Sequence, residues 1–251
     1  MTKPTLYKDN SKSNNFFETM QTVMANRLAK PYGGNEPIVY EFTNDRAMLH
    51  QYYRLRETMY ERIHHIDASE MGEDTFDKIG HVLIARRGRL CLGGCRLVVR
   101  EADEMWPLPL ETSDFKLRNI FPNLPLNKIR HGEISRFAVM EDTGQDENIL
   151  YGLCKIMYEK VVDLKIQYLF AKSPKTLARN WRLIANSLGV KTARICDNID
   201  VPGDSNTADM KFYIVMSDLS AQINPHLATI DTPALSIVSQ QDERPNLSMV
   251  E

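Results

Sequence analysis

Residues 132–140 read GEISRFAVM, and this stretch decides the fold because it places two charges inside a strand pattern. Its apolar residues are typical of a buried strand, while Glu133 and Arg136 interrupt them. A charged side chain on a buried strand must reach an edge or find a partner, because burying it alone is costly. The stretch therefore predicts a sheet strand that also carries a polar site.

The sequence on either side of this strand alternates between strand and helix periodicity. Strands are expected over 37–42, 81–86, 89–100, 166–172, 191–197 and 209–218, and helices over 16–30, 46–62, 149–165 and 175–189. Polar or proline-rich sequence predicts loops over 65–76 and 101–129. This order predicts an α/β fold in which a mixed central sheet is flanked by helices.

The chain has 251 residues, enough for one domain with its own core, and a net charge of −2. We expect an N-terminal lead and helix over 1–36, one domain over 37–220 and a C-terminal tail over 221–251. The charge gives no general attraction for nucleic acid. No apolar run approaches the roughly 18 residues of a membrane span, and the N-terminus lacks a secretory apolar core. A cytoplasmic protein is expected.

The cysteines are Cys91, Cys95, Cys154 and Cys196, which are few for a disulfide scaffold. Cys91 and Cys95 flank a diglycine in an expected strand, and further ligands at metal-binding spacing are missing. We therefore expect no metal site. The glycines indicate a bulge or a close approach of the backbone. Cys95 is a poor candidate nucleophile, because no positioned histidine is evident.

Charged residues in four segments can form one polar cluster. Arg96 and Arg136 lie in expected strands, where they need partners. Carboxylates are available at Asp74, Asp77 and Glu133. Such a network is either purely structural or holds and activates a polar substrate. A further pair, Arg56 and Tyr60, lies one helical turn apart and therefore shares a helix face.

These segments, in this order, resemble the acyl-homoserine lactone synthases and the long-chain N-acyl amino acid synthases, together with exosortase-associated acyltransferases. These families share an acetyltransferase-like (GNAT-like) fold. Their pattern is an Arg with an aromatic residue four positions on, Asp-x-x-Asp, a strand Arg after glycine, and Glu-x-Ser-Arg-Phe. The matching residues are Arg56, Tyr60, Asp74, Asp77, Arg96, Glu133, Ser135, Arg136 and Phe137. The resemblance covers about residues 40–215 and implies an acyltransferase.

Two departures from the pattern bear on the substrates. Ile66 stands where the lactone synthases have a Trp, which favours an amino acid acceptor over S-adenosylmethionine. Residues 141–152, EDTGQDENILYG, are acidic and lack the acetyltransferase pyrophosphate pattern, so coenzyme A is a poor donor. The expected donor is an acyl carrier protein, bearing the acyl group on a phosphopantetheine thioester, with no permanently bound cofactor. An acidic carrier protein needs a basic docking patch, for which the candidates are Lys172, Lys175, Arg179 and Arg182.

The implied chemistry is amide formation from a thioester. Glu133 is the expected general base that takes the proton of the acceptor amine. Arg136 and Asp77 are expected beside it in the catalytic site, and Arg56 and Arg96 either pair with a substrate carboxylate or organise the aspartates. The backbone N–H groups of Phe137, Ala138 and Val139 are the expected oxyanion donors. Strands ending in FAVM and LFAK should splay to admit the pantetheine arm, as in the fold that this chain resembles.

Two other functions stay open at this point. One is a quorum-sensing autoinducer synthase that makes an acyl-homoserine lactone from S-adenosylmethionine. The other is a non-catalytic module that binds an acyl chain or a carrier protein; an intact Glu133 with both strand arginines argues against it.

Overall fold

The computed structural model describes residues 36–64, 67, 71–140, 149–190, 193–201 and 211–223. The helix expected over 16–30, Ile66, most of the acidic stretch 141–152 and nearly all of the expected tail lie outside the described residues. The domain boundaries drawn from the sequence therefore remain a prediction.

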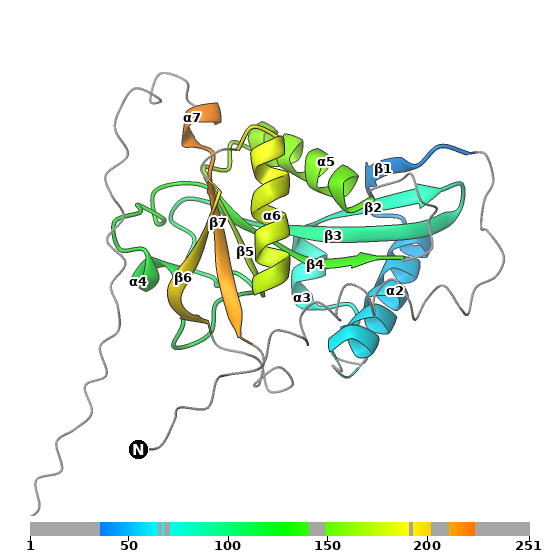
Figure 1. Ribbon diagram of the computed structural model, residues 1–251, viewed down its shortest axis with the longest axis horizontal. Coiled ribbons are helices and arrows are strands. Elements are labelled where there is room, and N and C mark those ends of the chain that lie inside the picture. Colours follow the sequence, from blue (N-terminus) through cyan, green and yellow to red (C-terminus); the bar gives the residue numbers. More distant parts are fainter. Residues whose placement is uncertain are drawn as a thin grey trace, which may run out of the picture.

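One seven-stranded sheet organises the described part of the chain, in the order β1-β2-β3-β4-β5-β7-β6 (Figure 1). Neighbouring strands are antiparallel except β4 and β5, which run parallel. The strands are β1 (Val39–Phe42), β2 (His81–Arg87), β3 (Leu90–Arg100), β4 (His131–Val139), β5 (Tyr168–Pro174), β6 (Arg194–Val201) and β7 (Phe212–Asp218). The predicted fold class, a mixed sheet flanked by helices, is confirmed.

Helices cover both faces of this sheet. They are α2 (Arg46–His64), α3 (Thr75–Ile79), α4 (Leu117–Ile120), α5 (Ile149–Asp163), α6 (Lys175–Ser187) and α7 (Ser220–Ile223). Leu83 of β2 packs in a core with α5 and α6, while its neighbours Val82 and Ile84 pack with α2. Because successive strand residues point to opposite faces, α2 lies across the sheet from α5 and α6, as Figure 1 shows. In the described part of the chain, none of the helices is both long and apolar enough to cross a bilayer.

The predictions missed short helical turns in the expected loops. α3 begins inside the loop expected over 65–76, because Asp74 accepts a hydrogen bond from the amide of Asp77 while the Asp77 carboxylate accepts from the amide of Asp74. This reciprocal capping box satisfies two amides that the helix itself leaves open. α4 likewise forms within the segment 101–130 that joins β3 to β4.

Segment 101–130 folds against the sheet face opposite α5 and α6. Its apolar side chains, among them Leu108, Phe115 and Leu126, form a core with Phe170 of β5 and Ile214 of β7. What the sequence presents as a long irregular connection is therefore a packed layer of the domain.

A buried polar cluster fixes this segment to β3. Glu111 Oε2 accepts hydrogen bonds from Arg100 at 2.7 Å and from the Leu108 amide at 2.9 Å, and its Oε1 accepts from the Leu117 amide at 2.8 Å. Arg100 also donates to Nε2 of His131 at 2.9 Å. Charge-assisted bonds of this kind compensate the cost of burying the ions.

β4 and β5 separate near their middle. They pair at His131–Tyr168, Gly132–Leu169 and Glu133–Phe170, after which β4 continues to Val139 and β5 to Pro174. The predicted splay is present, and it begins at Glu133.

Candidate active site

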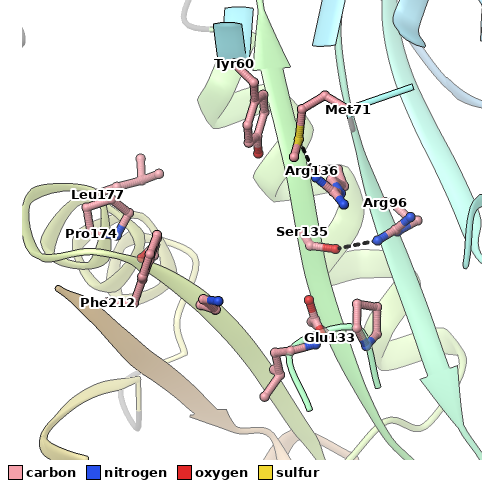
Figure 2. A pocket seen from close by; sticks show the side chains of 13 residues that line it. Tyr60, Met71, Arg96, Glu133, Ser135, Arg136, Pro174, Leu177 and Phe212 are labelled. Atoms are coloured by element: carbon pink, nitrogen blue, oxygen red, sulfur yellow. Dashed lines mark hydrogen bonds between the residues drawn. The ribbon is translucent and has the colours of Figure 1, made fainter. Parts of the chain in front are cut away.

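A pocket of about 170 Å³ lies where β4 and β5 separate (Figure 2). In Figure 2, Glu133 and Ser135 lie on the β4 side, and Pro174, Leu177 and Phe212 lie on the opposite side. The full lining is Tyr60, Met71, Arg96, Pro109, Leu110, Glu133, Ser135, Arg136, Lys172, Ser173, Pro174, Leu177 and Phe212. The pocket thus combines polar groups from β3 and β4 with apolar groups from α6, β7 and segment 101–130.

Glu133 is the buried acid of this pocket, with 3% of its surface exposed. Its Oε2 accepts a 2.6 Å hydrogen bond from the amide of Leu110. Burial raises the pKa of Glu133 to about 7, although the Leu110 amide and the nearby Arg96 oppose that rise. A carboxyl group that titrates near neutral pH is suited to accept and release a proton.

Arg96 lies beside Glu133 and is completely buried. It contacts Asp74 at 2.6 Å and Asp77 at 3.1 Å, and its Nη2 donates to Ser135 Oγ at 3.4 Å. Burial alone would raise the pKa of Asp74. The hydrogen bond from Arg96 and its positive charge outweigh this effect, so the pKa of Asp74 lies below its usual value. The predicted ion pairs therefore form with two of the three expected carboxylates, Asp74 and Asp77, and Arg96 joins this network to the pocket.

Arg56 belongs to the same network but is not among the residues that line the pocket. Its guanidinium donates to both oxygens of Asp77, at 2.7 and 3.1 Å, and to the carbonyls of Met71 and Gly72. Of the two aspartates Arg56 contacts only Asp77, and this pair anchors α3 to α2. Asp77, expected in the catalytic site, is likewise buried against two arginines.

Arg136 occupies an irregular position in β4. Arg96 pairs with Ser135 whereas Gly94 pairs with Ala138, so β4 carries a bulge at this point. Arg136 has a φ of 60°, in the left-handed region that non-glycine residues rarely adopt. Its side chain contacts Met71 and reaches Asp74 at 3.4 Å.

Tyr52 of α2 supports this bulge from the α2 side of the sheet. Its hydroxyl donates to the carbonyl of Arg136 at 2.6 Å, and its ring lies against Gly94 of β3. A Cβ at Gly94 would come within 2.7 Å of that ring, which explains the glycine. The bulge predicted at the diglycine is present next to Gly94, where the register with β4 shifts, whereas the close contact with the Tyr52 side chain was not predicted.

The other predicted site residues divide into two groups. Tyr60 and Ser135 line the pocket. The expected oxyanion residues lie on β4 beyond Glu133, but their side chains pack elsewhere: Phe137 stacks edge-on against Trp181, and Ala138 is buried against α2. Val139 packs on the α5 and α6 side. The backbone amides of Phe137 and Val139 remain candidates for the oxyanion site.

Three of the four expected docking residues are exposed on α6, and the fourth lines the pocket. Arg179 and Arg182 are exposed on α6, as docking requires, and Lys175 is exposed at the start of that helix. Lys172 instead lines the pocket, with its Nζ 4.6 Å from the ring centre of Phe212.

Sequence reasoning missed seven residues that line the pocket: Met71, Pro109, Leu110, Ser173, Pro174, Leu177 and Phe212. The PLPLE stretch at 107–111 stood out only as irregular sequence. Nothing in the sequence pattern indicates that it meets Glu133, because this contact joins residues 23 positions apart.

The cysteine thiols are poorly suited to act as nucleophiles. All four cysteines are buried and reduced, and burial raises the pKa of the Cys95 thiol well above its usual value. A protonated thiol is a weak nucleophile. Among the described residues no group of three or more His, Cys, Asp or Glu side chains is arranged to hold a metal ion.

No protein-family model matches the chain, and no curated protein matches it either. Several solved structures, however, are similar to this chain. FeeM, an N-acyl amino acid synthase from uncultured soil microbes, is similar with a TM-score of 0.55 at 13% identity, over 73% of this chain and 92% of FeeM.

Two acyl-homoserine lactone synthases are also similar. LasI has a TM-score of 0.46 at 13% identity, over 76% of this chain and 96% of LasI. BjaI, a CoA-dependent synthase described with S-adenosylmethionine and isopentyl-CoA, has a TM-score of 0.49 at 18% identity, over 80% of this chain and 92% of BjaI. The splayed mixed sheet and the likeness to FeeM together show that this chain has a GNAT-like fold.

Proposed function

We propose that the protein is an N-acyltransferase that moves a fatty acyl group from an acyl carrier protein to the amine of an amino acid. The observation that carries this proposal is Glu133, a buried carboxyl with a pKa of about 7 at the point where two parallel strands separate. The likeness of the fold to FeeM supports the same class of reaction.

The reaction needs few groups from the protein. The acceptor ammonium gives one proton to Glu133, and the free amine then attacks the thioester carbonyl carbon. The C–S bond breaks, and the second amine proton neutralises the departing thiolate. The proposed donors to the developing oxyanion are the backbone amides of Phe137 and Val139 on β4. The Ala138 amide faces β3, as does the Met140 amide, which donates to the Leu92 carbonyl.

The network around Arg96 has a positioning role in this proposal. Asp74 and Asp77 fix the Arg96 guanidinium, which lies at the pocket and lowers the pKa of Glu133 by its charge. Arg136 adds a second positive charge with the same effect. Both arginines thereby keep part of Glu133 ionised at neutral pH, as a base requires.

The carrier protein is supported by the position of α6. This helix begins directly after Pro174 and contributes Leu177, and both residues line the pocket. Arg179 and Arg182 are exposed farther along the same helix. An acidic carrier docked there would have the pocket mouth close to its pantetheine arm.

The test is product analysis by mass spectrometry. Purified protein is given acyl carrier proteins and acyl-CoAs of several chain lengths, with amino acids and S-adenosylmethionine present together. An N-acyl amino acid supports the proposal, and an acyl-homoserine lactone would replace it with the autoinducer synthase. Tight binding of acyl carrier protein without any product would indicate the non-catalytic module.

Glu133→Gln is the diagnostic variant, with Glu101→Gln as its matched control. Glu101 is a surface glutamate that pairs with Arg130 at 2.7 Å. The product should disappear with the first substitution and persist with the second.

A further inference from the structure

The peptide bond between Arg136 and Phe137 lies at the β4 bulge, beside the pocket that Arg136 lines. The register of β3 and β4 shifts here, so Arg136 and Phe137 of β4 stand against one residue of β3, Cys95. Arg136 has a φ of 60°, a left-handed conformation that a non-glycine residue keeps only where its surroundings hold it. Contacts from both faces of the sheet hold this peptide unit.

Tyr52 of α2 holds the carbonyl of the peptide unit. Its hydroxyl donates to the Arg136 carbonyl at 2.6 Å, and its side chain is buried. Burial raises the pKa of the Tyr52 hydroxyl, so this group keeps its proton and acts as a donor. The ring is held in turn, because it lies against Gly94 and the central guanidinium carbon of Arg56 lies 5.4 Å from the ring centre. The donor therefore has a fixed position beside the bulge.

Helix α6 holds the following side chain from the opposite face of the sheet. The Phe137 ring stacks edge-on against Trp181, with the ring centres 4.5 Å apart and the ring planes at 76°. Trp181 belongs to the core that α5 and α6 form with the sheet, whereas Tyr52 belongs to the core under α2. The peptide unit is thus fixed from α2 at its carbonyl and from α6 at the next side chain.

Fixing the carbonyl also fixes the amide of the same peptide unit. In a planar trans peptide the C=O and N–H bonds point in opposite directions, so the Arg136 carbonyl sets the direction of the Phe137 amide. The Met140 amide donates to Leu92 of β3, and the Ala138 amide faces the same side by alternation. The Phe137 amide therefore points away from β3, toward the gap where β4 and β5 separate.

We propose that Tyr52 is a positioning residue for the oxyanion site. Through the Arg136 carbonyl it aims the Phe137 amide into the gap between β4 and β5, where this amide donates to the carbonyl oxygen of the acyl thioester as negative charge develops. Tyr52 is not among the residues that line the pocket, so it acts through the backbone. This inference rests on the proposed function and extends it to a residue of α2.

The kinetic test uses Tyr52→Phe, which removes the hydroxyl and keeps the ring against Gly94. Loss of one oxyanion donor lowers kcat roughly 10²- to 10³-fold, and here the amide is misdirected rather than lost, so kcat should fall roughly 10- to 100-fold. KM for donor and acceptor should stay unchanged. The matched control is Tyr158→Phe, which removes another buried tyrosine hydroxyl, 3.0 Å from Ser217 Oγ, and should keep the wild-type kcat. An unchanged kcat in Tyr52→Phe would overturn the inference.

A change in the acceptor atom of the substrate distinguishes positioning from a general loss of structure. In an acyl dithioester a sulfur atom replaces the carbonyl oxygen, and sulfur accepts hydrogen bonds poorly. The ratio of kcat for the thioester to kcat for the dithioester should be several-fold larger in the wild type and in Tyr158→Phe than in Tyr52→Phe. An equal ratio in these proteins would show that the Tyr52 hydroxyl has no influence at the carbonyl oxygen.

A binding measurement separates this inference from the proposed function. The amide proton resonance of Phe137 is followed by NMR while S-decanoyl-pantetheine is added to saturation, without any acceptor. In the wild type and in Tyr158→Phe this resonance should move downfield, because a hydrogen bond deshields the amide proton, and in Tyr52→Phe the shift should be lost. An absent shift in the wild type, or an equal shift in Tyr52→Phe, contradicts the inference whether or not any acyl transfer is detected.

Discussion

The backbone amide of Leu110 donates a 2.6 Å hydrogen bond to Oε2 of Glu133, and so joins segment 101–130 to the proposed base. An amide can only donate, so this bond stabilises the ionised carboxylate over the neutral acid. It also fixes the position of one carboxylate oxygen. The segment that walls the pocket therefore also influences the charge state of Glu133.

The first prediction concerns the pH dependence of catalysis. The value of kcat/KM should rise as the pH increases through about 7, because Glu133 must be ionised to accept a proton. Glu133→Gln should lower it by a factor on the order of 10² to 10⁴ and abolish this rising limb. A rising limb near pH 7 that survives in the variant would belong to another group.

The second prediction concerns stability. The pKa of Glu133 is raised from 4.5 to about 7 by folding, so the folded state resists its ionisation. Stability from this group is fully present below pH 4.5 and is lost as the pH rises through about 7. Glu133→Gln, which cannot ionise, should therefore be more stable than the wild type at pH 8, by an amount on the order of 3 kcal/mol.

The measurement for this second prediction is chemical denaturation of both proteins at several pH values. The difference in unfolding free energy should grow between pH 4.5 and about 7 and then level off. Other titrating groups are common to both proteins and cancel in the difference. A difference that is independent of pH would mean that Glu133 titrates normally in the folded state.

The third prediction concerns Glu111, which holds the segment that carries Leu110. Its two carboxylate oxygens accept bonds from Arg100 and from two backbone amides. In Glu111→Gln the side-chain NH₂ must face a donor, so stability should fall by about 1–3 kcal/mol. The looser segment should also weaken the hydrogen bond from Leu110 to Glu133. Because that bond lowers the pKa of Glu133, the rising limb of the pH–rate profile should move to higher pH.

The control for Glu111 is Glu104→Gln, at an exposed position in the same segment. This variant should keep both the unfolding temperature and the pH–rate profile of the wild type. If Glu111→Gln lost stability without any shift in the profile, the segment would be a structural layer with no influence on the base.

The fourth prediction concerns Asp77, whose substitution should act in the opposite direction to that of Glu133. Asp77→Asn removes the charge that both Arg56 and Arg96 contact in the interior. Breaking such a buried pair leaves uncompensated charge and typically costs about 3–5 kcal/mol. Thermal unfolding at pH 7 should show this loss, whereas Asp114→Asn, at an exposed position, should show none.

The fifth prediction concerns the acyl donor. The double variant Arg179→Glu/Arg182→Glu should raise KM for acyl carrier protein without affecting KM for the acceptor, and added salt should have the same effect on the wild type. The matched control is Lys78→Glu/Arg118→Glu, which changes the same charge at exposed positions on α3 and α4. Equal use of acyl-CoA, with no effect of either double variant, would argue for a coenzyme A donor.

The sequence by itself determined the order of strands and helices and most of the charged network. Periodicity is a local property, so the bounds of β2, β3 and α5 could be expected from short windows. A charge in a buried strand demands a partner, and Arg96 indeed contacts two of the available carboxylates. The short α3 was not predicted, because its capping box depends on the exact hydrogen bonds of Asp74 and Asp77.

Only the tertiary structure decided which of these charges face the pocket. The sequence leaves Arg56 and Arg96 with the same two possible roles, yet Arg56 is enclosed by Asp77 and backbone carbonyls while Arg96 reaches the pocket. Lys172 could equally be a surface lysine, and it lines the pocket because strand pairing ends at Glu133. The pKa of Glu133 is likewise a tertiary property, because it depends on burial beneath a segment that is distant in the chain.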